Sequence, residues 1–169
     1  MRCFEIEGFC PLRPEDYNQD PSKISPATEQ YNCIAFALGE TTKPWWPSKR
    51  LKDDYEWPEH LGREEEHQET LQNFVRAFET RRYRLCKDGK LQPGIEKIAL
   101  FVSPLGNPLH AALQLESGVW KSKCGDYQDI EHSNVNFCNA YGRAVAYMRR
   151  RRDGKPFWIE RIKAFLPIP

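Results

Sequence analysis

One α+β domain is the fold that this sequence predicts, with N-terminal helices packed on a mostly antiparallel sheet. Two observations lead to it: helical patterns lie in the first half of the chain, and short apolar segments separated by Gly-containing turns fill the second half. A third observation is the length, because 169 residues suit a single hydrophobic core. We therefore expect one domain over residues 1–169, with an irregular N-terminal arm at 1–30 and a folded core at 31–165.

The first half of the chain supplies two helices and one long loop. The segment YNCIAFALGE predicts a short helix that begins at Asn32 or Cys33 and stops at Gly39. Residues 41–62 contain three prolines and several aromatic side chains, which is typical of a loop packed on the body of a protein. From residue 63 to 82, apolar side chains at i, i+3, i+4 and i+7 of a charged run predict an amphipathic helix. These apolar side chains are Leu71, Phe74, Val75 and Phe78.

Strands are predicted for the second half, where the apolar period shortens. A hairpin turn is expected at Ser117 and Gly118, and a final hairpin over residues 143–165 is expected to turn at Asp153 and Gly154. The remaining strands are expected at residues 83–86, 97–102, 110–115 and 119–123.

Composition and charge exclude several classes of protein. Hydrophobic residues make up 40% of the chain and five tryptophans are present, so general disorder is excluded. With 25 basic and 24 acidic residues the net charge is +1, which offers no global field for nucleic acid or an anionic membrane. No apolar run approaches the ~18 residues that span a bilayer, and the N-terminus lacks the apolar stretch of a signal peptide. We expect a cytoplasmic protein, with export by a specialised secretion route still open, and we expect no membrane or nucleic-acid partner.

The six cysteines are expected to be reduced thiols, because the chain is not small and shows no export signal. No C-x-x-C pair occurs, so a structural zinc site has little support, and neither a metal nor a cofactor is expected. One Cys/His set lies within thirty residues, but its spacing matches no common zinc arrangement. That set is His110, Cys124, His132 and Cys138.

A cysteine and a histidine carry the chemistry that the sequence offers. Cys33 is expected at the N-terminus of a helix, where unpaired backbone N–H groups stabilise a thiolate. His110 is expected at the start of a strand beside a loop, where an imidazole can take the thiol proton. The alternative for Cys33 is an inert core thiol, since cysteine is among the most buried residue types.

Two further residues complete the expected site. Counting outward from the predicted hairpin places His110 opposite Cys124 to Asp126, so Asp126 is expected to orient the imidazole. Asp129 and Glu131 are its rivals if a bulge shifts the register. Gln30, just upstream of the cysteine, is expected to donate a hydrogen bond to a developing oxyanion. His132 is expected at the surface or in a loop.

This order of residues resembles the papain-like superfamily, including its NlpC-type and amidase branches. The segments YNCIAFALG, WWP, LHAALQL, WKSKCGDYQDIEH and YGRAV also look like those of an uncharacterised bacterial family, over about residues 30–150. The resemblance implies a papain-like fold and a Cys-His site at Cys33 and His110. The C-G-x-C-W neighbourhood of papain itself is missing, so the likeness does not extend to its endopeptidase activity.

Two functions follow from these observations. The first is a cysteine-dependent hydrolase or amidase that attacks an amide carbonyl of a protein or peptide-like substrate through an acyl-enzyme, without a cofactor. The second is a non-catalytic interaction module of the immunity or adaptor type. Trp45, Trp46 and Trp57 are candidates for a substrate groove, although they also suit a sealed core. The run MRRRR makes residues 143–163 locally basic by +6, and we interpret it as a solvated strand end.

Overall fold

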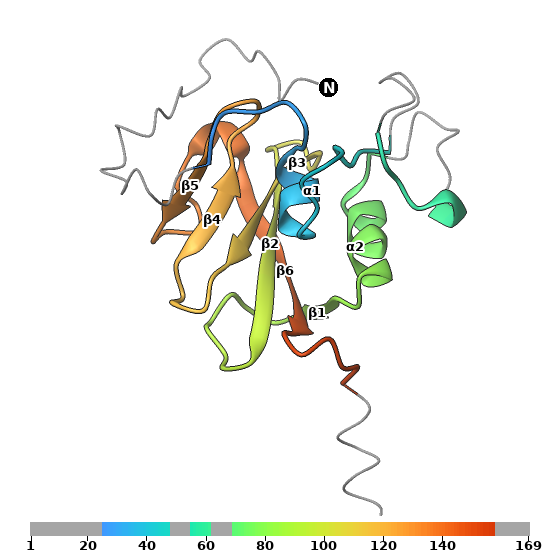
Figure 1. Cartoon of the computed structure of the whole chain (residues 1–169), viewed down its shortest axis with the longest axis vertical. Coiled ribbons are helices and arrows are strands. Elements are labelled where there is room, and N and C mark those ends of the chain that lie inside the picture. The colour runs from blue at the N-terminus through green and yellow to red at the C-terminus, as the bar shows by residue number, and fades with distance from the viewer. Residues whose placement is uncertain (1–24, 48–54, 62–68, 158–169) are drawn as a thin grey trace, which may run out of the picture.

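A single antiparallel sheet dominates the computed structural model, which describes residues 25–47, 55–61 and 69–157 (Figure 1). The sheet has six strands in the order β1-β6-β2-β3-β4-β5, and every neighbouring pair is antiparallel. The strands are β1 (Arg84–Cys86), β2 (Ile95–Val102), β3 (Pro108–Gln114), β4 (Trp120–Lys123), β5 (Asp129–His132) and β6 (Arg143–Arg151). The helices are α1 (Cys33–Ala37) and α2 (Leu71–Thr80), with short 3-10 helices η3 (Glu59–Leu61) and η4 (Asn139–Tyr141).

The expected α+β class, a papain-like core of helices packed on a sheet, is wrong for this chain. The described residues form a largely β structure in which the two α-helices are short, with five residues in α1 and ten in α2. Helix α1 ends early because Gly39 takes a positive φ of 79°, which ends helical geometry. The amphipathic helix expected at 63–82 is observed only from Leu71, and residues 62–68 lie outside the described part.

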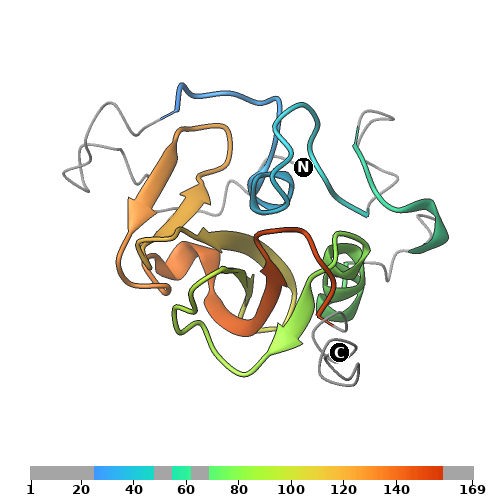
Figure 2. The same cartoon turned by 60° about the horizontal axis from the view of Figure 1, so that its bottom comes forward.

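The two faces of the sheet bury different side chains. Both α-helices lie over one face, as Figures 1 and 2 show. Because side chains alternate along a strand, Ile98 and Leu100 of β2 point to this helix-covered face, whereas Ala99 and Phe101 point to the opposite face. This alternation decides which candidate residues can meet.

Helix α1 is held in place by its cap. The side-chain oxygen of Asn32 accepts hydrogen bonds from the backbone N–H groups of Ala35 at 3.0 Å and Trp45 at 3.2 Å. Its side-chain nitrogen donates to the Trp45 carbonyl at 2.9 Å. One amide therefore caps the helix and fastens the tryptophan-containing loop to it.

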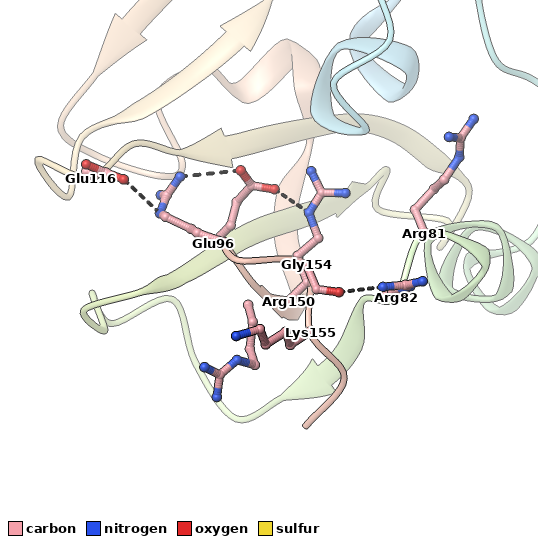
Figure 3. A pocket seen from close by; sticks show the side chains of 9 residues that line it. Arg81, Arg82, Glu96, Glu116, Arg150, Gly154 and Lys155 are labelled. Carbon is pink, nitrogen blue, oxygen red and sulfur yellow. Dashed lines mark hydrogen bonds and ion pairs between the residues drawn. The ribbon is translucent and has the colours of Figure 1, made fainter. Parts of the chain in front are cut away.

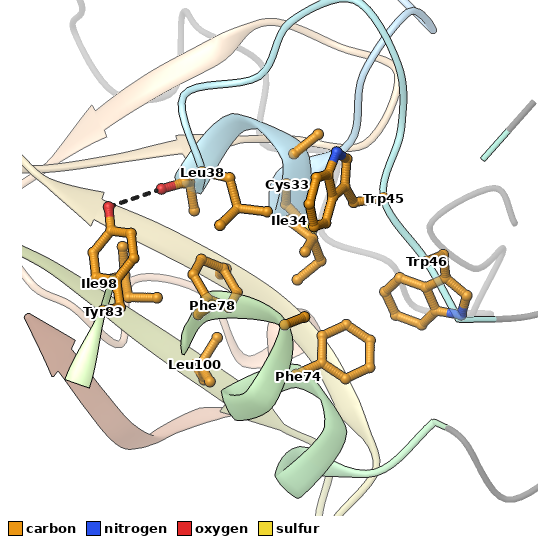
Figure 4. Packing of buried hydrophobic residues seen from close by; sticks show 14 of the residues in the cluster. Cys33, Ile34, Leu38, Trp45, Trp46, Phe74, Phe78, Tyr83, Ile98 and Leu100 are labelled. Atoms are coloured by element: carbon orange, nitrogen blue, oxygen red, sulfur yellow. Dashed lines mark hydrogen bonds between the residues drawn. The ribbon is translucent and has the colours of Figure 1, made fainter. Parts of the chain in front are cut away.

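Helix α2 buries the face that its sequence pattern predicts. Thr70 caps it by accepting a hydrogen bond from the N–H of Asn73 at 3.2 Å. Phe74 and Phe78 are fully buried, and Trp46 packs edge-on against Phe74 with ring centroids 4.9 Å apart (Figure 4).

The strand predictions are confirmed for β1 to β4, within a few residues at their ends. The expected hairpin joins β3 to β4, with Gln114 opposite Trp120. The prediction of a final hairpin is wrong. Strand β6 lies between β1 and β2 and pairs with both, so its two edges are taken by strands other than the expected second arm. Residues 158–169, which belong to that arm, lie outside the described part. Among the described residues no helix is long and apolar enough to cross a membrane.

Candidate functional site

Cys33 lies where the sequence predicts it, at the first position of α1, but its side chain is fully buried at 0% exposure. It packs in the core between the helices and the sheet (Figure 4). Its sulfur lies 4.0 Å from the carbonyl oxygen of Leu109 in β3. The helix N-terminus is therefore present, but the sulfur is not open to solvent.

His110 faces the other side of the sheet. Its neighbour Ala111 belongs to the core cluster of Cys33, while Ala112 belongs to the opposite cluster. The imidazole packs against Phe101 with ring centroids 5.2 Å apart and stacks on Tyr141 at 4.2 Å. The expected Cys33–His110 dyad is thus not assembled, because strand alternation directs the imidazole away from the face that α1 covers.

The expected orienting residue does not reach His110 either. Asp126 is exposed in the turn between β4 and β5. Of its two rivals, Asp129 accepts a hydrogen bond from the Tyr31 hydroxyl at 3.2 Å, and Glu131 alternates with Ile130 and so lies on the same side as Asp129. None of the three carboxylates orients the imidazole.

The remaining predicted site residues are also placed differently from expectation. Gln30 is exposed, whereas the sulfur it was expected to serve is buried. The three tryptophans expected to line a substrate groove are instead buried in the core of the described structure. These are Trp45, Trp46 and Trp57.

His110 instead belongs to a buried chain of hydrogen bonds that sequence reasoning missed. Its Nε2 lies 3.0 Å from Ser122 Oγ, and that oxygen lies 2.9 Å from Nε2 of His132. Nδ1 of His132 lies 2.7 Å from the carbonyl oxygen of Asn134, so it carries a proton and donates. Ser122 then donates to His132 and accepts from His110. The clue in the sequence is the alternation of Ser122 and His132 with charged residues in β4 and β5.

Burial keeps both imidazoles neutral. Desolvation, with a smaller contribution from the charge of the other histidine, lowers the pKa of His110 to about 3. Desolvation also lowers the pKa of His132 to about 4, against a smaller opposing effect of its bond to Asn134. Because this chain of hydrogen bonds between His110, Ser122 and His132 is buried, we assign it a structural role. No group of three or more His, Cys, Asp or Glu side chains is placed to hold a metal ion within the described ranges.

An open pocket of about 520 Å³ lies at the other end of the sheet, where α2 ends and β6 leaves β2 (Figure 3). Six basic and two acidic side chains line it, so basic groups are in excess by four. They are Arg81, Arg82, Arg150, Arg151, Arg152 and Lys155, with Glu96 and Glu116, and Gly154 completes the wall.

Glu96 organises the pocket from within. It accepts a hydrogen bond from Nε of Arg150 at 2.7 Å and faces Nη1 of Arg152 at 3.4 Å. The hydroxyl of Tyr83 donates to the same carboxylate at 2.5 Å. Burial first, and then the charge of Glu96, raises the pKa of that phenol, so it stays protonated as a donor. The carboxylate therefore fixes the inner edge of two guanidinium groups.

Several cations of the pocket keep donors available for a ligand. Within the described residues, the terminal nitrogens of Arg150 have no hydrogen-bond partner, and the same holds for the guanidinium of Arg81, which lies over the Trp45 ring at 5.0 Å. In contrast, Arg152 is engaged by Glu116 at 3.5 Å and by the Gln114 carbonyl at 3.1 Å.

Arg82 occupies a conformation that ordinary side chains rarely adopt. Its φ is 67°, and in the described part of the chain it is the single residue other than glycine with a positive φ. Glycine or asparagine is usual at such a position after a helix. Here an arginine takes the strained conformation, and its side chain donates to the Gly154 carbonyl across the pocket (Figure 3).

The sequence carried a signal for this pocket, the MRRRR run, which we interpreted as a solvated strand end. Two facts were missing from that interpretation: β6 pairs with β2, which places Glu96 opposite Arg150, and α2 ends beside both strands. Neither follows from local composition.

Comparison with known proteins adds the family but no activity. No curated protein and no solved structure matches the chain. One family model matches residues 22–149. The likeness to papain-like proteins stays a prediction. Because the matched segment spans more than half of the sequence, the chain belongs to the family described as Domain of unknown function (DUF7689).

Proposed function

We propose that this chain is a non-catalytic interaction module that uses its basic pocket to bind anionic groups of a partner molecule. The observation that carries the proposal is the excess of four basic side chains around one open pocket. Guanidinium groups bind carboxylate and phosphate oxygens through two parallel hydrogen bonds, and the nitrogens of Arg81 and Arg150 that have no partner in the described part of the chain suit this role. The pocket volume lies within the range of about 300–1,000 Å³ that is usual for ligand sites.

The cysteine hydrolase or amidase has weaker support. It needs an accessible thiolate beside an imidazole, whereas Cys33 is fully buried and His110 lies on the opposite face of the sheet. The hydrolase stays a prediction, and the interaction module is the function that the geometry favours.

Calorimetric titration with two anionic probes tests the interaction module. One probe is inorganic triphosphate and the other is a peptide of ten aspartate and glutamate residues. We expect at least one probe to bind, and we expect Arg81→Gln to weaken that binding about tenfold, since a charge-assisted hydrogen bond contributes roughly 1.5–3 kcal/mol. Cys33→Ser serves as the control and should bind normally. Equal binding by the wild type and Arg81→Gln, or no binding of either probe, would refute the proposal.

Thiol labelling separates the two functions. In the native protein a thiol reagent should modify Cys86, which is partly exposed, well before Cys33. This order is expected because reaction at Cys33 requires its core to open first. Faster labelling of Cys33 at neutral pH would instead favour the hydrolase. Mass spectrometry of the digested protein identifies the modified residue.

A further inference from the structure

We infer that the basic pocket recognises clustered phosphate groups, as in a diphosphate or triphosphate, and that it does so without reading the rest of the ligand. The inference rests on the proposed function and names the class of anion. It is carried by cations, among them Arg81 and Arg150, that converge on one pocket, and none of the described residues that line this pocket has an apolar side chain.

The charge of the pocket matches two or three phosphates better than one carboxylate. The basic lining side chains exceed the acidic ones by four, and by three once the ion pair of Arg151 with Asp153 at 2.8 Å is counted. A terminal phosphate carries about −1.5 to −2 charges near neutral pH and each further phosphate in the chain adds about −1, so a chain of two or three carries roughly −3 to −4. A side-chain carboxylate carries one charge, and several of them on a peptide are spaced further apart than phosphates in a chain.

The donors are arranged for a compact ligand. Arg81 and Arg82 approach from the end of α2, and Arg150 approaches from β6 (Figure 3). Glu96 holds Nε of Arg150 at 2.7 Å, and the terminal nitrogens of Arg150 have no partner among the described residues. Because the guanidinium is already fixed at one edge, less side-chain freedom is lost when an anion binds at the other.

The described wall of the pocket offers no aromatic platform for a nucleobase. Within the described part of the chain, every lining residue is charged apart from Gly154, and none has an aromatic or aliphatic side chain. Proteins that hold bases without sequence preference use aromatic stacking platforms. The affinity of the pocket for a ligand should therefore increase with the number of linked phosphates and should not depend on whether a base is attached.

The strained backbone at Arg82 also supports a ligand site at this pocket. A positive φ outside glycine persists where the surroundings impose it, and such positions cluster at ligand sites. Here the unusual conformation places a cation at the pocket beside the Gly154 carbonyl.

Calorimetric titration of the full chain at constant ionic strength tests the inference with five probes. They are orthophosphate, pyrophosphate, inorganic triphosphate, AMP and ATP. We expect triphosphate and ATP to bind within about threefold of each other, and orthophosphate and AMP to bind at least tenfold more weakly. Tighter binding of ATP than of triphosphate by tenfold or more would overturn the claim that the rest of the ligand is not read.

Two variants and one matched control locate the binding. Arg81→Gln and Arg150→Gln should each weaken triphosphate binding about tenfold. Arg143→Gln changes the charge equally at an exposed residue at the other end of β6, outside the pocket, and should leave binding unchanged. Arg81 is exposed, so its replacement keeps the test valid even if Arg150→Gln fails to fold.

The acidic peptide separates this inference from the proposed function. If the peptide binds in an Arg81-dependent way and triphosphate does not, the phosphate inference is overturned and the interaction module stands. If triphosphate binds equally well to the wild type and both variants, the pocket is not its site and the inference is overturned.

Discussion

Acid should destabilise this protein well above the pH at which its carboxylates titrate, because two histidines are buried in their neutral form. Burial lowers the pKa of His110 to about 3 and that of His132 to about 4, whereas an unfolded histidine titrates near 6.5. Below pH 6.5 the two histidines therefore bind protons in the unfolded chain but stay neutral in the folded protein. Stability is retained above pH 6.5 and falls as the pH drops toward the two folded values.

The size of the loss follows directly from these values. At pH 5 the folded histidines are still neutral, so the penalty per histidine depends only on the unfolded pKa, about 1.5 units above the solution pH. Each unit corresponds to about 1.4 kcal/mol, which gives about 2 kcal/mol per histidine and about 4 kcal/mol for the pair. That is a large part of the roughly 5–15 kcal/mol typical of a folded domain.

Urea denaturation at pH 5, 6, 7 and 8 measures this dependence. His110→Gln removes one titrating group and keeps an amide N–H that can donate to Ser122. The variant loses packing against Tyr141 at every pH, so its absolute stability is lower, but its decline from pH 8 to pH 5 should be about 2 kcal/mol smaller than that of the wild type. An identical decline in both proteins would show that His110 is not buried in its neutral form.

Four other substitutions, one of them a matched control, test the packing and the strained backbone. Gly142→Ala should lower the free energy of unfolding by about 3 kcal/mol or more, because a Cβ there would lie 2.0 Å from the Val102 carbonyl oxygen. Gly106→Ala is the control, since Gly106 has a similar positive φ but a Cβ there would meet no atom within 4 Å. It should lower the free energy of unfolding by only about 1–2 kcal/mol, measured for both variants by urea unfolding. Arg82→Gly should leave the free energy of unfolding within about 1 kcal/mol of the wild-type value, because relief of the strained positive φ offsets the greater conformational freedom of glycine in the unfolded state. Triphosphate binding should nevertheless weaken, because the variant lacks the guanidinium group. Phe74→Ala should cost about 3–5 kcal/mol and shift the tryptophan emission, because two indole rings pack edge-on against this fully buried ring.

Local pattern predicts most elements of this fold but not their proportion. The apolar segments that become β2 and β3 are found to within a few residues because buried central strands are nearly continuous apolar runs. Strand β5 escapes prediction because its four residues, DIEH, include only one apolar side chain. Within the described residues α1 has five residues and α2 begins at Leu71, so helices form a smaller share of the fold than the sequence pattern suggests.

The candidate site is harder to predict because it depends on which face each side chain takes. The sequence places Cys33 correctly at a helix start and His110 correctly on a strand. Which face the histidine takes is set by how β3 pairs with β2 and how α1 docks, and neither is encoded near His110. The pocket is missed for the same reason: its members come from α2, β2 and β6, which meet only through long-range pairing.

The membership of the pocket makes a sharp prediction within the arginine run of β6. Arg150 faces Glu96 in the pocket, whereas its neighbour Arg149 lies over the Phe157 ring at 5.0 Å and lines no part of the pocket. Arg149→Gln and Arg150→Gln remove the same charge one residue apart, so a purely electrostatic surface would treat them alike. If the pocket binds the anion by direct contact, Arg150→Gln should weaken triphosphate binding about tenfold. Arg149→Gln should weaken it less than twofold, because this guanidinium does not touch the anion and salt screens its longer-range attraction. Equal losses in the two variants would mean that the run acts as a diffuse basic patch, and direct recognition by the Arg150 guanidinium would be refuted.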